Sequence, residues 1–219
     1  MNDTKKNPER GEGFLAKLSP FVALCAVLAV LTAVLGWGWL SQTPSQEELY
    51  SDTGRFIQEF KNLFLRGEIV WWSPNFMQGG SSATYFAVSF VLIIANFFEL
   101  LFGDPAGMKI LALLTIPGAG LAAYAFTKRL TGEGWMAFLA GFLYATNAQI
   151  LLRIASFEHT ASAVAFVFVP LALLGFIKVA DEGSWRASAL LGLFWSILML
   201  TYAKLTFMLV PIAAVFFVW

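Results

Sequence analysis

Residues 18–40 carry no charged side chain and read LSPFVALCAVLAVLTAVLGWGWL. An α-helix needs about 20 mostly apolar residues to cross a hydrocarbon core that is ~30 Å thick, and this run is long enough. It is also about twice as long as the apolar core of a secretory signal peptide, and it lacks a persuasive small-x-small cleavage site near its end. The run therefore predicts an uncleaved first membrane-spanning helix.

The composition of the whole chain agrees with this prediction. Of its 219 residues, 58% are hydrophobic and 13% are charged, and its mean hydropathy is +0.71. Soluble domains carry about 25% charged residues, so water alone would not keep this chain dispersed. Its net charge is zero and no basic stripe is present, which argues against a nucleic-acid partner. We expect an all-α protein, a polytopic bundle of transmembrane helices.

The charges that flank the first helix predict its orientation. Residues 1–17 contain four cations, and the positive-inside rule places this tail in the cytoplasm and residue 41 outside. Residues 18–219 then form one transmembrane domain in the plasma membrane, with a long external loop at residues 41–106. The apolar run that reaches Trp219 has no flanking charge, which predicts a fragment whose domain continues beyond it. The other expected spans are residues 107–127, 135–152, 160–179, 187–202 and 205–219.

Residues 85–102 are the difficult segment, because hydropathy alone would make them a span. Asn96 and Glu99 interrupt the segment, and its length is marginal. When the Lys and Arg of the long first external loop are left out, eight Lys or Arg lie inside and three outside if the segment does not cross. If it crosses, the numbers are seven and four. We therefore predict that it lies along the outer leaflet. The inside set is Lys5, Lys6, Arg10, Lys17, Lys128, Arg129, Lys178 and Arg186, and the outside set is Lys109, Arg153 and Lys204.

On this topology the outer face gathers the residues that could carry chemistry. Ionisable groups at membrane depth are costly and usually functional, and a carboxylate beside cations can act as a general base. Simpler roles are open for several of them: Asp52 could favour a helix dipole, Arg153 and Lys204 could snorkel, and the tryptophans could form an aromatic belt. The set is Asp52, Trp71, Trp72, Arg153, Glu158, His159, Tyr202 and Lys204.

The order of motifs resembles the GT-C superfamily of membrane glycosyltransferases, especially its YfhO-like and protein-mannosyltransferase-like branches and the membrane proteins related to 6-pyruvoyl-tetrahydropterin synthase. The resemblance covers nearly the whole chain from Leu18 onward. The matching residues are Ser51-Asp52-Thr-Gly-Arg55-Phe56, Leu65-Arg66-Gly67-Glu68, Trp72-Ser-Pro74, Gly79-Gly80, Leu101-Phe102-Gly103, Lys128-Arg129, and Glu158-His159 before a span that contains Pro170-Leu171.

This resemblance implies that Asp52 is the active-site acid. Its carboxylate would deprotonate or orient an acceptor hydroxyl that attacks the anomeric carbon of a polyprenyl-phosphate-linked sugar. The phosphate would leave, and nearby cations would stabilise its charge. The implied cations are Arg153, His159 and Lys204, and the rest of the implied substrate-binding set is Arg55, Trp72, Glu158 and Tyr202.

A divalent metal is a further implication, since some branches hold Mg²⁺ or Mn²⁺ with acidic residues. Here the pair would be Asp52 and Glu158. Many relatives carry a second acid or an aromatic residue beside the first acid, whereas Asp52 is followed by Thr53-Gly54. This departure leaves both the metal and the class of acceptor open.

Two other functions compete with the glycosyltransferase. In a transporter or flippase-like protein, Asp52, Glu158 and His159 would belong to an ion or substrate path. Such a protein should place its polar groups near the bilayer midplane at broken helices, and prolines inside three predicted spans could break them. A scaffolding subunit would need none of these groups. The three prolines are Pro117, Pro170 and Pro211.

Overall fold

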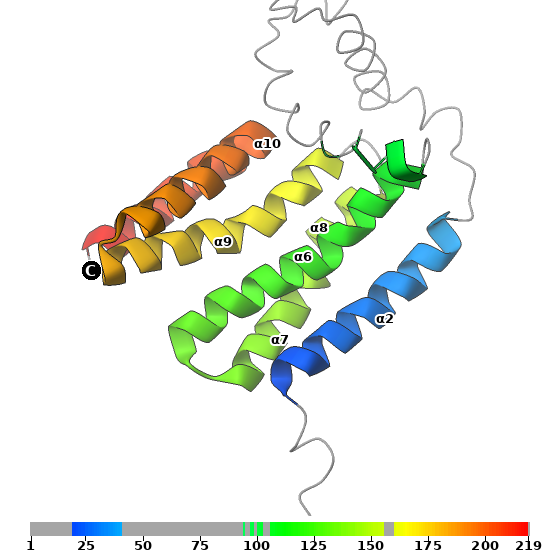
Figure 1. Ribbon diagram of the computed structural model, residues 1–219, viewed down its shortest axis with the longest axis horizontal. Helices are drawn as coiled ribbons and strands as arrows, with labels where there is room; N and C mark the ends of the chain where they lie inside the picture. The colour runs from blue at the N-terminus through cyan, green and yellow to red at the C-terminus, as the bar shows by residue number, and fades with distance from the viewer. Residues whose placement is uncertain are drawn as a thin grey trace, which may run out of the picture.

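The computed structural model describes residues 19–40, 94, 97–98, 100–102, 106–155 and 160–218. Within these residues the secondary structure is helical and contains no strand, which confirms the all-α prediction for this part of the chain (Figure 1). The long helices are α2 (Pro20–Leu40), α6 (Ala106–Thr131), α7 (Gly134–Ala145), α8 (Ala148–Ala155), α9 (Thr160–Glu182) and α10 (Trp185–Val218).

Several of these helices suit a bilayer. Helix α2 is apolar all round, so it buries Leu24 and Leu28 on one side while Val30 stays exposed on the other. Such a helix fits lipid, which solvates apolar side chains and leaves backbone groups to bond within the helix. Among the described residues, Pro20–Gly38, Lys109–Thr131 and Ser162–Glu182 are long and apolar enough to span, and α7 with α8 would be a fourth span if the bent pair counts as one.

Contacts between the helices fix their directions. The ring centroids of Phe21 and Tyr124 lie 5.5 Å apart, while Leu28 packs against Gly120, so α2 and α6 are antiparallel. Helix α9 runs parallel to α6, because Val167 lies beside Gly118 and the α9 residue Asp181 reaches the end of α6.

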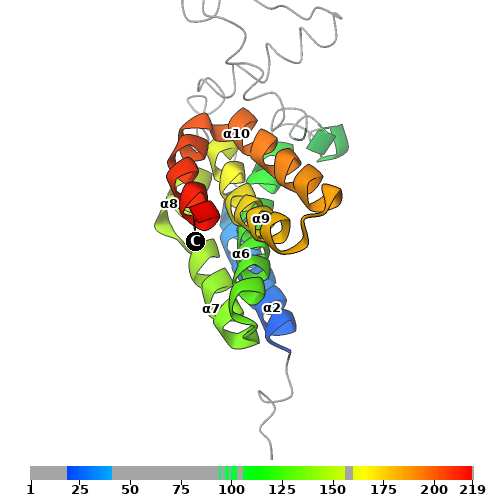
Figure 2. The ribbon, with the colours of Figure 1, turned by 90° about the vertical axis from the view of Figure 1, so that its left-hand side faces the viewer.

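The bundle therefore has two ends, which both views show (Figures 1 and 2). The Arg153 end gathers the end of α2, the start of α6, the end of α8 and the start of α9. The Arg129 end gathers the start of α2, the end of α6, the start of α7, and the junction between α9 and α10. The chain leaves α2 and enters α6 at the same end of the bundle. The prediction for residues 85–102 itself falls largely outside the described residues.

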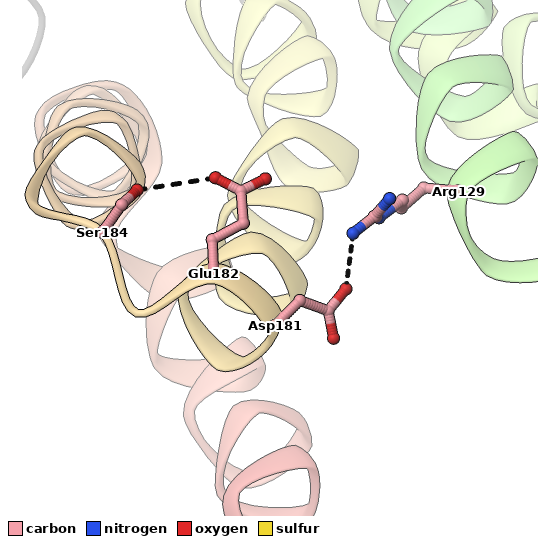
Figure 3. A network of polar contacts seen from close by, with 4 residues as sticks. All are labelled: Arg129, Asp181, Glu182 and Ser184. Carbon is pink, nitrogen blue, oxygen red and sulfur yellow. Dashed lines mark hydrogen bonds and ion pairs between the residues drawn. The ribbon is translucent and has the colours of Figure 1, made fainter.

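At the Arg129 end, an ion pair joins two parallel helices (Figure 3). The Nη2 atom of Arg129 in α6 lies 2.7 Å from Oδ2 of Asp181 in α9, and the neighbouring Glu182 carboxylate accepts a hydrogen bond from Ser184 at 3.5 Å. The Arg129 and Asp181 side chains are about half exposed. Exposed pairs contribute about 0–1 kcal/mol, so this one fixes the register of α6 and α9 more than it stabilises the fold.

The span predicted at residues 135–152 is not one straight helix. Helices α7 and α8 meet at a bend of 42°. The Thr146 hydroxyl donates to the Phe142 carbonyl at 2.9 Å, and the Asn147 side-chain oxygen accepts the Gln149 N–H at 2.8 Å. Asn147 is thus an N-cap, which starts a new helix instead of continuing the old one.

Helix α10 is broken at Tyr202, where φ is −156° and ψ is 79°. The sequence predicted a turn two residues later, at Lys204. Beside the break, the hydroxyl of Thr201 donates to the Ile197 carbonyl at 2.8 Å and that of Thr206 to the Tyr202 carbonyl at 3.4 Å. Figure 2 shows the second half of α10 running back toward the Arg129 end. Neither this break nor the α7–α8 break falls at a proline.

Pro170 instead leaves a backbone carbonyl of α9 without its helical hydrogen bond, and a side chain of another helix supplies the missing donor. Proline has no N–H, so Pro170 cannot bond the Phe166 carbonyl four residues earlier in α9. The hydroxyl of Tyr144 in α7 donates to that carbonyl at 2.9 Å. The contact therefore replaces a helical hydrogen bond with one that fixes α7 against α9.

Tyr144→Phe is expected to destabilise the protein by about 1–3 kcal/mol, because the Phe166 carbonyl loses its partner in an apolar setting. In a Pro170→Ala background the restored N–H serves this carbonyl, and the same replacement should cost much less. Unfolding by SDS in bicelles would measure both differences, with Tyr124→Phe as the matched control. Equal losses in the two backgrounds would contradict the proposed exchange of partners.

Candidate functional site

The predicted site residues divide into three groups. Arg153 and Tyr202 are described with their side chains, and the structure brings them together. Lys204 lies in α10 close to the break, but its side chain is outside the described set. The remaining members lie outside the described residues altogether: Asp52, Arg55, Trp71, Trp72, Glu158 and His159.

Arg153 is the centre of the described site. It lies in the last turn of α8, and its Nη1 donates to the Ser162 hydroxyl of α9 at 2.6 Å. Its guanidinium carbon is 5.2 Å from the centroid of the Tyr202 ring and 5.8 Å from that of Phe166. The break in α10 thus brings Tyr202 to a point where three helices meet around one cation.

Within the described part of the chain, the Arg153 guanidinium has only some of its hydrogen-bond partners. Its Nε is buried and has no hydrogen-bond partner among the residues that the structure describes. Arginine stays charged at any physiological pH, and buried donors are normally paired. The two aromatic rings favour the cation, since such contacts contribute from about 0.5 to 2 kcal/mol with increasing desolvation. A planar cation with a spare donor suits a carboxylate or a phosphate.

Among the residues that the structure describes, the charged side chains at the Arg153 end are all positive. Within the described residues 106–116, 148–155, 160–167 and 195–210 there is no Asp or Glu, whereas Lys109, Arg153 and Lys204 all lie there. The side chain of Lys109, near the start of α6, is only 3% exposed. The Arg129 end differs, because its four cations are mixed with Glu133, Asp181 and Glu182. Clustered charge of one sign beside low-dielectric walls attracts ligands of the opposite sign.

Three residues of this region were not predicted as site residues. Ser162 and Phe166 lie in an apolar run, where a serine or a phenylalanine that faces a functional group looks like one that faces lipid. Lys109 was counted only as an outer cation. One sequence signal could have identified Lys109 as a site residue. It lies at the start of a predicted span, and the first turn of α6 contains no acidic residue.

Metal binding is not supported by the described part of the chain. No group of three or more His, Cys, Asp or Glu that could hold a metal ion occurs there. Asp52 and Glu158, the residues expected to hold Mg²⁺ or Mn²⁺, lie outside the described residues. That expectation stays a prediction.

Comparison with known proteins adds no assignment. The chain matches no protein-family model, no curated protein and no solved structure. The arrangement of its own residues is therefore what any functional proposal has to rest on.

Proposed function

We propose that this protein is a membrane glycosyltransferase that transfers a sugar from a polyprenyl-phosphate-linked donor to an acceptor at the extracytoplasmic face. The observation that carries the proposal is the Arg153 guanidinium, held by Ser162, Phe166 and Tyr202 at a bundle end whose described residues include no carboxylate. A planar cation suits the phosphate of such a lipid, and apolar helices suit its hydrocarbon chain.

The proposed reaction uses Arg153 together with Asp52, which lies between α2 and α6 in the sequence. The donor phosphate binds Arg153. Asp52 accepts the proton of the acceptor hydroxyl, whose oxygen forms a bond to the anomeric carbon. The bond between that carbon and the phosphate oxygen breaks, and the electron pair leaves with polyprenyl phosphate. Arg153 stabilises the charge that develops on this leaving group.

A transporter is the second candidate, favoured by the breaks at Thr146–Asn147 and Tyr202. Broken helices often bind substrates near the middle of a membrane. Arg153, however, lies in the last turn of α8 and not at the α7–α8 break, and the Tyr202 break lies at the same bundle end. The polar groups thus gather at one end, which supports the transferase.

Thiol labelling tests the proposed arrangement. Single cysteines at Asp104, Glu133 and Glu158, with Cys25 replaced, would be treated on intact cells with a membrane-impermeant reagent. We expect labelling at Asp104 and Glu158 and protection at Glu133, since Glu133 lies at the Arg129 end. The same membranes should release polyprenyl phosphate from a pool of lipid-linked sugars. Labelling at Glu133 alone would contradict the proposal. So would a release of polyprenyl phosphate no greater than that from cells that lack the protein.

A further inference from the structure

We infer that exposed tryptophans at the two ends of the bundle lie in the two headgroup regions of the bilayer, and that the Arg153 site lies at the boundary of the hydrocarbon in one of them. The partner of these two surfaces is the phospholipid itself. The depth of the bundle in the membrane does not depend on the proposed reaction.

Charged residues mark the two boundaries of the hydrocarbon along the helices. Three helical stretches contain no Asp, Glu, Lys or Arg, and each is about 26 to 27 Å long at 1.5 Å per residue. They are residues 110–127 in α6, 160–177 in α9 and 187–203 in α10. A charged residue lies within two positions of every one of their ends. Their length matches a hydrocarbon core that is about 30 Å thick, so the bundle crosses it once from the Arg129 end to the Arg153 end.

At the Arg129 end, two equivalent turns each bring an exposed tryptophan to this boundary. Helix α6 ends before Gly132 (φ 73°) and α9 before Gly183 (φ 56°), and each glycine N–H donates to the carbonyl four residues earlier at 3.0 Å. The helices that follow carry Trp135 and Trp185 in their first turns, with side chains 49% and 75% exposed. Tryptophan is enriched at membrane interfaces, where its ring meets acyl chains and its N–H meets headgroups.

The opposite boundary has a tryptophan as well. Trp37 lies in the last turn of α2, at the Arg153 end, and its side chain is 85% exposed. Trp195 provides the contrast, because it lies in the middle of the charge-free stretch of α10 and its ring packs 5.3 Å from that of Phe176, measured between centroids. Exposed tryptophans at both ends, with a packed one between them, are the pattern of two interfacial belts.

The depth of the Arg153 site follows from these levels. Helix α10 is about 26 Å long between Trp185 and Tyr202. With Trp185 in one headgroup region, Tyr202 therefore lies close to the other. The guanidinium carbon of Arg153 is 5.2 Å from the centroid of the Tyr202 ring, so the cation lies at the same level. Lipid phosphates of that leaflet are within its reach, whereas a site at the midplane would be too deep for them.

Fluorine NMR of the whole chain in phosphatidylcholine nanodiscs measures these depths. Fluorinated tryptophan would be incorporated at all eight tryptophans, and single Trp→Phe variants would assign the resonances. The lipids carry a nitroxide either on the headgroup or at the end of an acyl chain, and line broadening falls steeply with distance from it. We expect Trp37, Trp135 and Trp185 to be broadened more by the headgroup nitroxide. Trp195, the internal control, should be broadened more by the chain-end nitroxide.

Fluorinated tyrosine gives the same reading for the site itself. Tyr202 should respond more to the headgroup nitroxide, and Tyr144, midway along the bent α7–α8 span, more to the chain-end nitroxide. Stronger broadening of Trp135 or Trp185 by the chain-end nitroxide would overturn the assignment of that boundary. The same result for Tyr202 would place Arg153 near the midplane and overturn its assigned depth. Should a Trp→Phe variant fail to fold, Trp→Tyr assigns the same resonance.

Discussion

Arg153→Met is expected to lower the rate of sugar transfer about 10²- to 10³-fold, the range seen when one preorganised donor to a developing negative charge is removed. The replacement deletes both the charge and the fork that now bonds Ser162 and lies against Tyr202. Arg153→Lys should recover part of the rate, because lysine restores a charge without the planar fork. Transfer from a lipid-linked sugar by purified protein, compared at equal folded amounts, measures the effect. Arg129→Met, which breaks an exposed ion pair, is the matched control and should leave the rate unchanged.

The kinetic constants distinguish Arg153 from the proposed base. Arg153 would contact the phosphate before and during the reaction, so its loss should raise KM for the donor and lower kcat. Asp52→Asn removes the proton acceptor for the other substrate, so kcat should fall while donor binding is kept. A rate for Arg153→Met within twofold of the wild-type rate would mean that the phosphate binds elsewhere.

Hydropathy predicted the described helices well, for a physical reason. A segment in lipid must bond its own backbone groups, so an apolar run of sufficient length has few alternatives to a helix. The run at residues 18–40 is thus found as Pro20–Leu40, and the span predicted at 160–179 is found as Thr160–Glu182. The sequence did not predict the positions of the two helix breaks, between α7 and α8 and within α10. Thr146 and Asn147 are two polar residues in a long apolar run. Averaging the hydropathy over that run hides their contribution.

Of the residues that meet in the described site, only Arg153 and Tyr202 were predicted from the sequence. Arg153 and Tyr202 stood out because charged and polar aromatic residues are rare in apolar runs, and topology assigned them to one face. Their contact depends on the α10 break and on Ser162 and Phe166, which no hydropathy pattern separates from lipid-facing positions. The roles of Asp52 and of the other members outside the described residues stay predictions.

Helices α6 and α7 cross in close contact at Gly120 and Gly141. A Cβ atom at Gly141 would lie 2.7 Å from the Gly120 carbonyl oxygen and 2.9 Å from Cδ2 of Leu24. A leucine tip can rotate away, but a backbone oxygen moves only with its helix. Small residues at such crossings let transmembrane helices approach closely. Helix α7 leads into α8 and Arg153, so we expect this crossing to influence where Arg153 lies in the bundle.

Gly141→Ala should therefore destabilise the protein by about 3 kcal/mol, the upper end of the range for overpacking, because α6 and α7 must separate. The variant that does fold should bind polyprenyl phosphate more weakly, since the same separation shifts α8 and with it Arg153. Unfolding by SDS and binding in nanodiscs give the two readings. Gly192→Ala in α10 is the control: its added Cβ meets nothing within 4 Å, and alanine favours a helix over glycine by up to about 1 kcal/mol. A Gly141→Ala protein as stable as this control would mean that the two helices can part without cost, and that the position of Arg153 is set by other contacts.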